Sequence, residues 1–151
     1  METLKNTEKT IHCFTHILFV TTDPLSNAFL SHPLKNVFPG QVKVSTVENS
    51  NEALKYLDSM ADNQEFGQVD VVLLDLDLPG RHGGLNAYQL ARVINEQSSK
   101  EHSEIICGAL TMFIVPELKE RCLEENFKFI FDKTKTAKEL SGVITKLLYP
   151  V

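Results

Sequence analysis

Short runs of apolar residues alternate along the chain with segments in which apolar residues recur every three or four positions. The first run, residues 17–20, ends in polar Thr21-Thr22-Asp23, the pattern of a strand that is buried on both faces of a parallel sheet. Similar apolar or β-branched runs predict four more strands, over residues 42–47, 69–74, 105–110 and 127–131.

The segments between the first runs carry the end signals of helices. Asp23 can cap the first helix and Pro24 suits its first turn. Pro33 is predicted to end or kink this helix early, because proline lacks an N–H group and its ring crowds the preceding turn. Asn49 or Ser50 is expected to cap the second helix.

The second half of the chain repeats this alternation. A third helix is predicted by apolar residues at helical spacing, namely Ala87, Leu90, Ala91 and Ile94. The polar residues 96–103 after it predict a loop. A fourth helix is expected over about 116–125 with Asn126 as a left-handed cap, and Thr136 with Glu139 predicts a capping box for a fifth.

Strand followed by helix, five times, predicts the α/β fold class. The expected architecture is a (βα)5 doubly wound parallel five-stranded sheet of the flavodoxin-like type, because parallel crossovers need long, right-handed connections. It spans residues 15–151 and follows a flexible N-terminal leader, residues 1–14. In such folds the site lies at the carboxyl ends of the strands, which directs attention to Thr21, Thr22, Asp75, Thr111 and Lys133.

Composition narrows the class of protein. The 151 residues, 42% of them hydrophobic and 23% charged, suit one globular domain. A formal charge of −5 argues against nucleic-acid binding, and the short apolar runs predict no membrane span. Three cysteines without metal-ligand spacing indicate free thiols in a reducing compartment, so we expect a cytoplasmic protein, with the nucleus as the alternative.

The residues at the strand ends resemble those of one family. An apolar strand that runs into Asp-x-x-x-Pro-Gly, here Asp75 to Gly80, is similar to the phosphoacceptor loop of response-regulator receiver domains. Thr111 ends the fourth predicted strand, and Lys133 follows the fifth strand 22 residues later, a spacing like that of the family. The resemblance covers residues 15–149, and it implies the receiver form of the flavodoxin-like fold.

The resemblance implies a two-component phosphorelay function, without catalytic residues or substrate turnover. Asp75 would accept a phosphoryl group from a histidine kinase or a histidine phosphotransfer protein. The Thr111 hydroxyl would hydrogen-bond that group and the Lys133 ammonium would pair with it. A downstream protein partner would then bind the face formed by the fourth helix, the fifth strand and the fifth helix.

The chain departs from the family where Mg²⁺ would bind. Receivers carry two adjacent acidic residues after the first strand, and Thr21 and Thr22 stand at those positions here. Asp75 and the backbone carbonyl of Asp77 would remain as ligands, so weak Mg²⁺ binding is expected. Asp23 could compensate through water, although helix capping is its expected role, and the Asp77 side chain is expected to face solvent.

Further departures support an alternative, a degenerate pseudo-receiver that acts as a phosphorylation-independent interaction domain. Thr134 replaces the proline after the family's lysine, and Ile130 stands at the aromatic switch position. Lys133 could form a permanent ion pair with Asp75 that favours one conformation. The apolar residues 112–115 predict either partner docking or simple burial. A small flavodoxin-like enzyme or nucleotide binder is disfavoured, because no glycine-rich phosphate loop is present.

Overall fold

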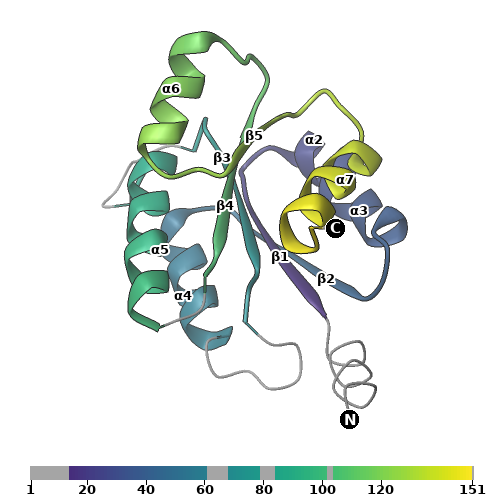
Figure 1. The fold of residues 1–151 in the computed structure, drawn as a ribbon, viewed down its shortest axis with the longest axis horizontal. Coiled ribbons are helices and arrows are strands. Elements are labelled where there is room, and N and C mark those ends of the chain that lie inside the picture. Colours follow the sequence, from purple (N-terminus) through teal and green to yellow (C-terminus); the bar gives the residue numbers. More distant parts are fainter. Residues whose placement is uncertain (1–13, 61–67, 79–83, 102–103, 151) are drawn as a thin grey trace.

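The computed structural model describes residues 14–60, 68–78, 84–101 and 104–150, which form a five-stranded parallel sheet (Figure 1). The strands lie in the order β2-β1-β3-β4-β5, which confirms the predicted flavodoxin-like architecture. Their bounds are Thr15–Val20 for β1, Val42–Val47 for β2, Val71–Asp75 for β3, Ile106–Thr111 for β4 and Phe129–Asp132 for β5. Residues 1–13 of the predicted leader, and Pro79 and Gly80 of the predicted loop, lie outside the described residues.

Helices cover both faces of the sheet (Figure 1). One face carries α4 (Ser50–Met60), α5 (Ala87–Glu101) and α6 (Pro116–Glu124). The other face carries α7 (Ala137–Leu148) and a first helical segment composed of α2 (Pro24–Ser26), the π-helical turn η1 (Asn27–Ser31) and α3 (His32–Val37). The two layers explain why the central strands read as continuous apolar runs.

Alternation along each strand divides the core into two clusters. In β1, Leu18 and Val20 pack toward α4 and α5, whereas Ile17 and Phe19 pack toward the first helical segment and α7. All four side chains have no exposed surface, and burial of each stabilises the fold by about 1.5–3 kcal/mol. The strands are therefore held rigidly up to the polar residues at their carboxyl ends.

The predicted helix caps are confirmed. Asp23 Oδ1 accepts a hydrogen bond from the Leu25 N–H group at 3.0 Å. Of the two candidates for α4, Asn49 is the cap, because its Oδ1 accepts from the Glu52 N–H group at 2.8 Å. Thr136 Oγ1 accepts from the Glu139 N–H group at 3.2 Å at the start of α7. Asn126 has φ 65°, so it provides the left-handed cap after α6.

Pro33 does not end the first helical segment, which excludes the first of the two predicted outcomes, but the helix is irregular directly before it. The chain stays helical to Val37, and the π-helical turn η1 directly precedes α3. In this wider turn the His32 N–H group donates to the Asn27 carbonyl, five residues back. The extra residue in the turn accommodates the proline ring, which has no N–H group to donate, without a break in the helix.

The predicted loop over residues 96–103 is also wrong. Helix α5 continues to Glu101, so most of this polar stretch is helical. The stretch contains no Pro or Gly, and Glu, Gln and Lys are good helix formers. Polarity alone therefore does not end a helix when no residue breaks its backbone pattern.

The two described cysteines are structural. Cys107 and Cys122 are free thiols buried in the cluster under α5 and α6. Burial raises the pKa of Cys107 to about 12, so this thiol stays protonated and unreactive. None of the helices within the described residues is long and apolar enough to cross a membrane.

Gly108 allows the ring of Phe129 to lie against the backbone of β4. The two residues are register partners, and a Cβ atom at Gly108 would collide with that ring. We expect Gly108→Ala to lower the free energy of unfolding by about 1–3 kcal/mol in urea denaturation. Gly142→Ala is the control, because a methyl group added there in α7 would meet open space. The higher helix propensity of alanine should raise the free energy of unfolding of this variant by about 0.5–1 kcal/mol. Equal effects of the two substitutions would contradict this packing.

Candidate functional site

The candidate site lies where β1 and β3 end side by side. From β1 the chain first crosses to β2 on one side and later returns to β3 on the other, which opens a crevice at the carboxyl ends of the two strands. Val20 pairs with Leu74, so Thr21 and Asp75 follow on adjacent strand ends. The topology therefore brings a hydroxyl and a carboxylate together from positions 54 residues apart.

Asp75 is the centre of the site. Its side chain is almost fully buried, with 4% of its surface exposed. Oδ2 accepts hydrogen bonds from Thr21 Oγ1 at 2.7 Å and from Lys133 Nζ at 2.9 Å. Oδ1 accepts from the Asp77 N–H group at 3.0 Å. The carboxylate is thus charge-paired and hydrogen-bonded through both oxygens, as a buried anion requires.

Lys133 supplies the counter-charge from the other side of β4. Its N–H group donates to the Thr111 carbonyl at 2.9 Å, which fixes the backbone just after β5. Its side chain is 7% exposed, and its ammonium lies 2.9 Å from Asp75 Oδ2 and 3.3 Å from Asp23 Oδ2. Burial opposes the charged form, but the hydrogen bonds and negative charges of the two carboxylates outweigh it and raise the pKa of Lys133.

Asp23 has two functions at once. Oδ1 caps the first helical segment, as predicted, while Oδ2 accepts from Lys133 Nζ and from Ser26 Oγ at 3.1 Å. Desolvation opposes ionisation of this carboxyl, but the hydrogen bonds from Leu25, Lys133 and Ser26 prevail and lower its pKa. Asp23 therefore caps the helix, as predicted, and also takes part in the site through its contact with Lys133.

Three other predicted site residues do not touch the Asp75 carboxylate with their side chains. Thr111 is buried, and its Oγ1 makes long contacts of 3.4 and 3.5 Å to the backbone of Phe113. The Asp77 side chain faces solvent as expected. Among the described contacts of Asp77, only its N–H group donates a hydrogen bond to the Asp75 carboxylate. Thr22 is exposed, in contrast to buried Thr21.

The residues at the strand ends do not fit a Mg²⁺ site. Mg²⁺ requires oxygen ligands in octahedral geometry and is held mainly by carboxylates. Within the residues that the structure describes, no three His, Cys, Asp or Glu side chains are grouped so that they could hold a metal ion. Thr21 directs its hydroxyl proton at Asp75 Oδ2, and each oxygen of Asp75 and Asp23 already accepts from a protein donor.

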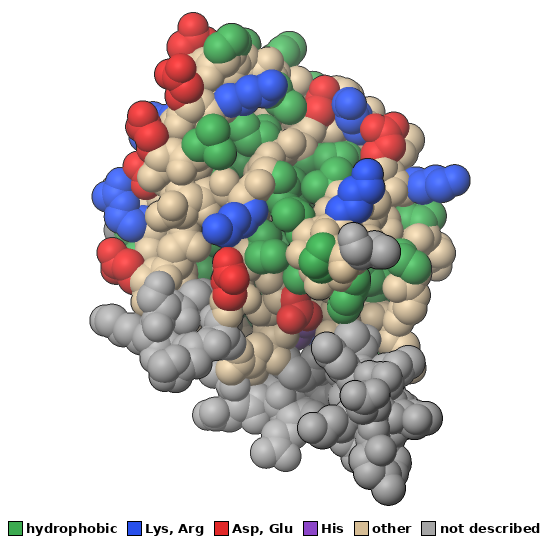
Figure 2. Space-filling model, in the orientation of Figure 1, with side chains coloured by type: hydrophobic (Ala, Val, Ile, Leu, Met, Phe, Trp, Pro, Cys, Tyr) green, Lys and Arg blue, Asp and Glu red, His purple; other side chains and the backbone are tan. Residues whose placement is uncertain are grey.

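An exposed apolar surface adjoins the site. Residues 112–115, which follow β4, have 36–77% of their surface exposed, so simple burial is excluded for them. Figure 2 shows apolar side chains gathered between α6 and α7, with Lys and Arg side chains at the margins. A groove of about 550 Å³ lies here. It is lined by Ile114, Lys119, Cys122, Leu123, Phe127, Phe129, Ile130, Asp132 and Lys135.

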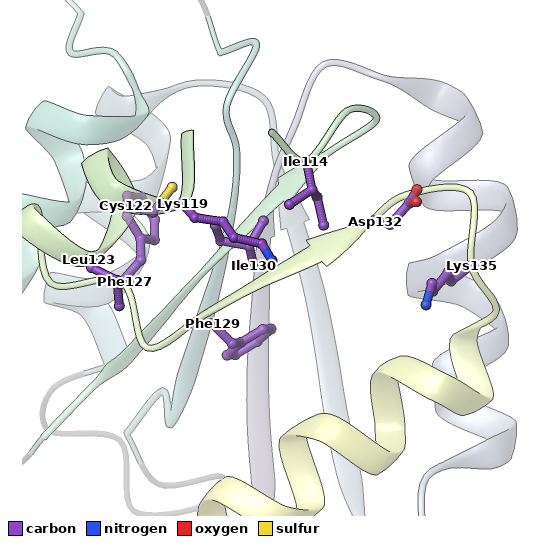
Figure 3. Close-up of a pocket in the computed structure, with 9 residues that line it drawn as sticks. All are labelled: Ile114, Lys119, Cys122, Leu123, Phe127, Phe129, Ile130, Asp132 and Lys135. Carbon is purple, nitrogen blue, oxygen red and sulfur yellow. The ribbon is translucent and has the colours of Figure 1, made fainter. Parts of the chain in front are cut away.

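Strand β5 forms the floor of this groove. In Figure 3, Lys119 extends from α6 toward Ile130, and Phe129 lies on the other side of the strand. Ile130 packs with the cluster under α5 and α6, whereas Phe129 and Phe131 pack with the cluster under α7. These three side chains are therefore divided between the two faces of the sheet.

Helix α6 is anchored to α5 near its carboxyl end. The Arg92 guanidinium holds the Glu125 carboxylate in a bidentate ion pair, in which Nη2 donates to Oε1 at 2.7 Å and Nε donates to Oε2 at 3.2 Å. The Arg121 guanidinium lies 3.9 Å from the centre of the Tyr88 ring, and this ring meets Phe127 edge to face. These contacts fix one end of the helix that borders the groove.

Comparison with known proteins supports the fold assignment. No family model and no curated protein matches the chain, but solved structures do. A mutant receiver domain of the histidine kinase CKI1 from Arabidopsis thaliana has a TM-score of 0.72 and 16% identity over 89% of each chain. The signal receiver domain of a DNA-binding response regulator from Colwellia psychrerythraea has a TM-score of 0.69 and 22% identity, covering 89% of this chain and 98% of that one.

A third similar structure carries a metal ion. The receiver domain of a sensor histidine kinase from Pseudomonas aeruginosa has a TM-score of 0.66 and 21% identity, covers 87% of this chain and 95% of its own, and has Mg²⁺ in its active-site cleft. The chain therefore has the fold of response-regulator receiver domains.

Sequence reasoning missed the function of the Thr21 hydroxyl. It treated Thr21 as a lost carboxylate, whereas the structure makes it a hydrogen-bond donor to Asp75. The available signal was the burial expected for a residue that directly follows a wholly apolar strand. A buried hydroxyl must find a partner, and Asp75 is on the neighbouring strand end.

We expect Lys133→Met to lower the free energy of unfolding by about 3–5 kcal/mol, because it leaves a buried carboxylate without its counter-charge. Lys135→Met is the matched control. Its ion pair with Glu139 is exposed and 3.9 Å long, so its removal should change stability by less than about 0.5 kcal/mol. Urea denaturation at neutral pH measures both. Similar losses for the two variants would show that the Asp75 carboxylate does not depend on Lys133.

Proposed function

We propose that this chain is a receiver-type signalling domain in which Asp75 accepts a phosphoryl group from a phosphohistidine. The donor would be a histidine kinase or a histidine phosphotransfer protein. The observation that carries the proposal is the buried Asp75 carboxylate at the switch point of the sheet, 2.9 Å from the Lys133 ammonium. Receiver domains of histidine kinases and response regulators among the similar structures support it.

The proposed reaction is a phosphoryl transfer without redox change. One carboxylate oxygen of Asp75 forms a bond to phosphorus, the P–N bond to the donor imidazole breaks, and its electron pair leaves with the imidazole, which takes up a proton. The product is an acyl phosphate. The Lys133 ammonium offsets repulsion between the carboxylate and the anionic phosphoryl group, and its placement by the rigid sheet needs no rearrangement.

Thr111 would sense the phosphoryl group. Its Oγ1 makes only weak contacts to the Phe113 backbone in the described structure, so little is lost when it turns toward a new acceptor. A hydrogen bond from this hydroxyl to a phosphoryl oxygen would pull the Thr111 side chain toward Asp75. The backbone of residues 112–115, which follows Thr111, would shift with it. The exposed apolar groove between α6 and β5 would then present a changed surface to a downstream protein.

Such a domain acts by protein contact and not by turnover of a substrate. The unpaired thiols of Cys107 and Cys122 suit the reducing conditions of the cytoplasm, where we place it.

A second candidate function is a phosphorylation-independent interaction domain. It is favoured by one observation, the 2.7 Å hydrogen bond from Thr21 to the same Asp75 oxygen that Lys133 contacts. A carboxylate held by three donors is a weaker nucleophile than one with a free oxygen. In this case the groove between α6 and β5 would bind its partner in a single, permanent form.

Incubation with acetyl phosphate separates the two candidates. We expect one phosphoryl adduct by intact mass spectrometry for the natural chain, since acetate is a good leaving group and Asp75 is the only buried carboxylate beside a lysine among the described residues. Asp75→Asn should form none, and Asp77→Asn, which removes an exposed carboxylate two residues away, should keep the adduct. Parallel samples contain Mg²⁺ or EDTA. Absence of the adduct in both would favour the second candidate.

Phosphorylation should change the groove as well as the pocket. In amide NMR spectra of the phosphorylated protein we expect shifts at Thr111, at residues 112–115 and at Lys133, because backbone hydrogen bonds join the ends of β4 and β5. Signals of α4 serve as the internal control, because none of the described residues that line the groove belongs to this helix. Shifts confined to the immediate neighbours of Asp75 would contradict signalling through the α6–β5 groove.

A further inference from the structure

Four residues at the strand ends form a closed ring of hydrogen bonds. Thr21 Oγ1 donates to Asp75 Oδ2 at 2.7 Å, and Lys133 Nζ donates to the same oxygen at 2.9 Å. Lys133 Nζ also donates to Asp23 Oδ2 at 3.3 Å, and the Asp23 N–H group donates to Thr21 Oγ1 at 3.0 Å. We call these residues, Thr21, Asp75, Lys133 and Asp23, the four-residue ring.

We propose that the four-residue ring replaces the divalent cation of this fold, with the Lys133 ammonium as its resident cation and Thr21 as the residue that positions Asp75 on it. The inference rests on the proposed function only for the role of Asp75. The pocket is assembled without a metal ion, so the structure of the pocket does not respond to Mg²⁺.

Every carboxylate oxygen in the ring already accepts at least one hydrogen bond from the protein. Asp75 Oδ1 accepts from the Asp77 N–H group, and Asp23 Oδ1 accepts from the Leu25 N–H group. The two Oδ2 atoms each accept from Lys133 and from one hydroxyl. A divalent ion would have to share the two Oδ1 atoms with their backbone donors, displace donors from the doubly occupied Oδ2 atoms and lose its own hydration, which Mg²⁺ does reluctantly.

The charges of the ring also favour one ammonium ion as its cation. The carboxylates of Asp75, 4% exposed, and Asp23, 30% exposed, contribute two negative charges, and the Lys133 side chain, 7% exposed, contacts both. Their attraction for one ammonium is strong at this burial, and each partner satisfies the other's hydrogen-bonding groups. Lys133 thereby provides both the positive charge and the donor geometry that hold two acidic groups together.

Thr21 links the two acidic residues of the ring. Its hydroxyl oxygen accepts from Asp23 while its proton is directed at Asp75, so it joins the two carboxylate-bearing residues directly. An acidic residue at this position would add a third negative charge and offer Asp75 no proton. Thr22, next in the chain, is exposed and makes no hydrogen bond among the described residues. The two threonines are thus a matched pair for experiment.

The test of the resident cation uses Mn²⁺ as the probe, followed by EPR and by thermal unfolding. The natural chain should show no saturable Mn²⁺ binding at millimolar concentrations, and EDTA should leave its unfolding midpoint unchanged. Lys133→Met frees the two carboxylates, so Mn²⁺ should bind this variant and raise its midpoint, whereas Lys133→Arg, which keeps the charge, should behave like the natural chain. Saturable Mn²⁺ binding by the natural chain that Asp75→Asn abolishes, or no response of Lys133→Met to Mn²⁺, would overturn the proposal.

The test of Thr21 uses the metal-free protein. Thr21→Val keeps the shape but removes the donor to Asp75 and the acceptor for Asp23, so the unfolding midpoint should fall by about 3–6 °C. Thr21→Ser keeps the hydroxyl and should restore most of this loss, and Thr22→Val should change the midpoint little. Equal midpoints for Thr21→Val and Thr22→Val, or a Thr21→Ser variant as unstable as Thr21→Val, would overturn the positioning role.

The outcome of the acetyl phosphate experiment is independent of these two tests, so a failure of the proposed function can be distinguished from a failure of the four-residue ring. If the natural chain forms no adduct but the Thr21 and Lys133 variants behave as expected, the ring stands and the phosphoacceptor role of Asp75 falls. If the adduct forms only with Mg²⁺ present and not with EDTA, the phosphoacceptor role stands and the ring as a replacement for the metal falls.

Discussion

Burial of a charge at the end of an apolar strand is the constraint on which this structure depends. Asp75 ends β3, whose residues are all buried. Burial of its carboxylate without a counter-charge would lower the free energy of unfolding by several kcal/mol. Lys133 provides that charge from beyond β5, so the pair spans β4 and joins the ends of three strands. The position of the loop after β5 is therefore determined by electrostatics as much as by apolar packing.

Much of this arrangement can be predicted from the sequence, because it follows from periodicity and topology. Alternating strands and helices dictate a parallel sheet, and a parallel sheet brings the residues after each strand to one edge, which places Asp75 and Lys133 together. Caps such as Asn49 and Thr136 are local, since donor and acceptor lie three residues apart. Features of this kind need no knowledge of distant contacts.

The features that escape prediction depend on three-dimensional detail. The direction of the Thr21 proton is set by a carboxylate 54 residues away, and the second contact of Asp23 is set by a lysine 110 residues away. Pro33 is expected to end or kink a helix because a regular α-helical turn excludes its ring, and the sequence does not show that a π-helical turn provides the extra room. The polar end of α5 resembles a loop because its hydrophobicity is low, yet no breaker residue occurs there.

The anchoring of α6 has a mechanical consequence. Arg92 and Tyr88 of α5 hold Glu125 and Arg121 at the carboxyl end of α6, while its amino end begins at Pro116, directly after the exposed residues 112–115. A helix fastened at one end moves as a lever about that pivot. A displacement that reaches α6 from the end of β4 would therefore be largest in its first turn, where Lys119 borders the groove, and would decrease toward the fastened end.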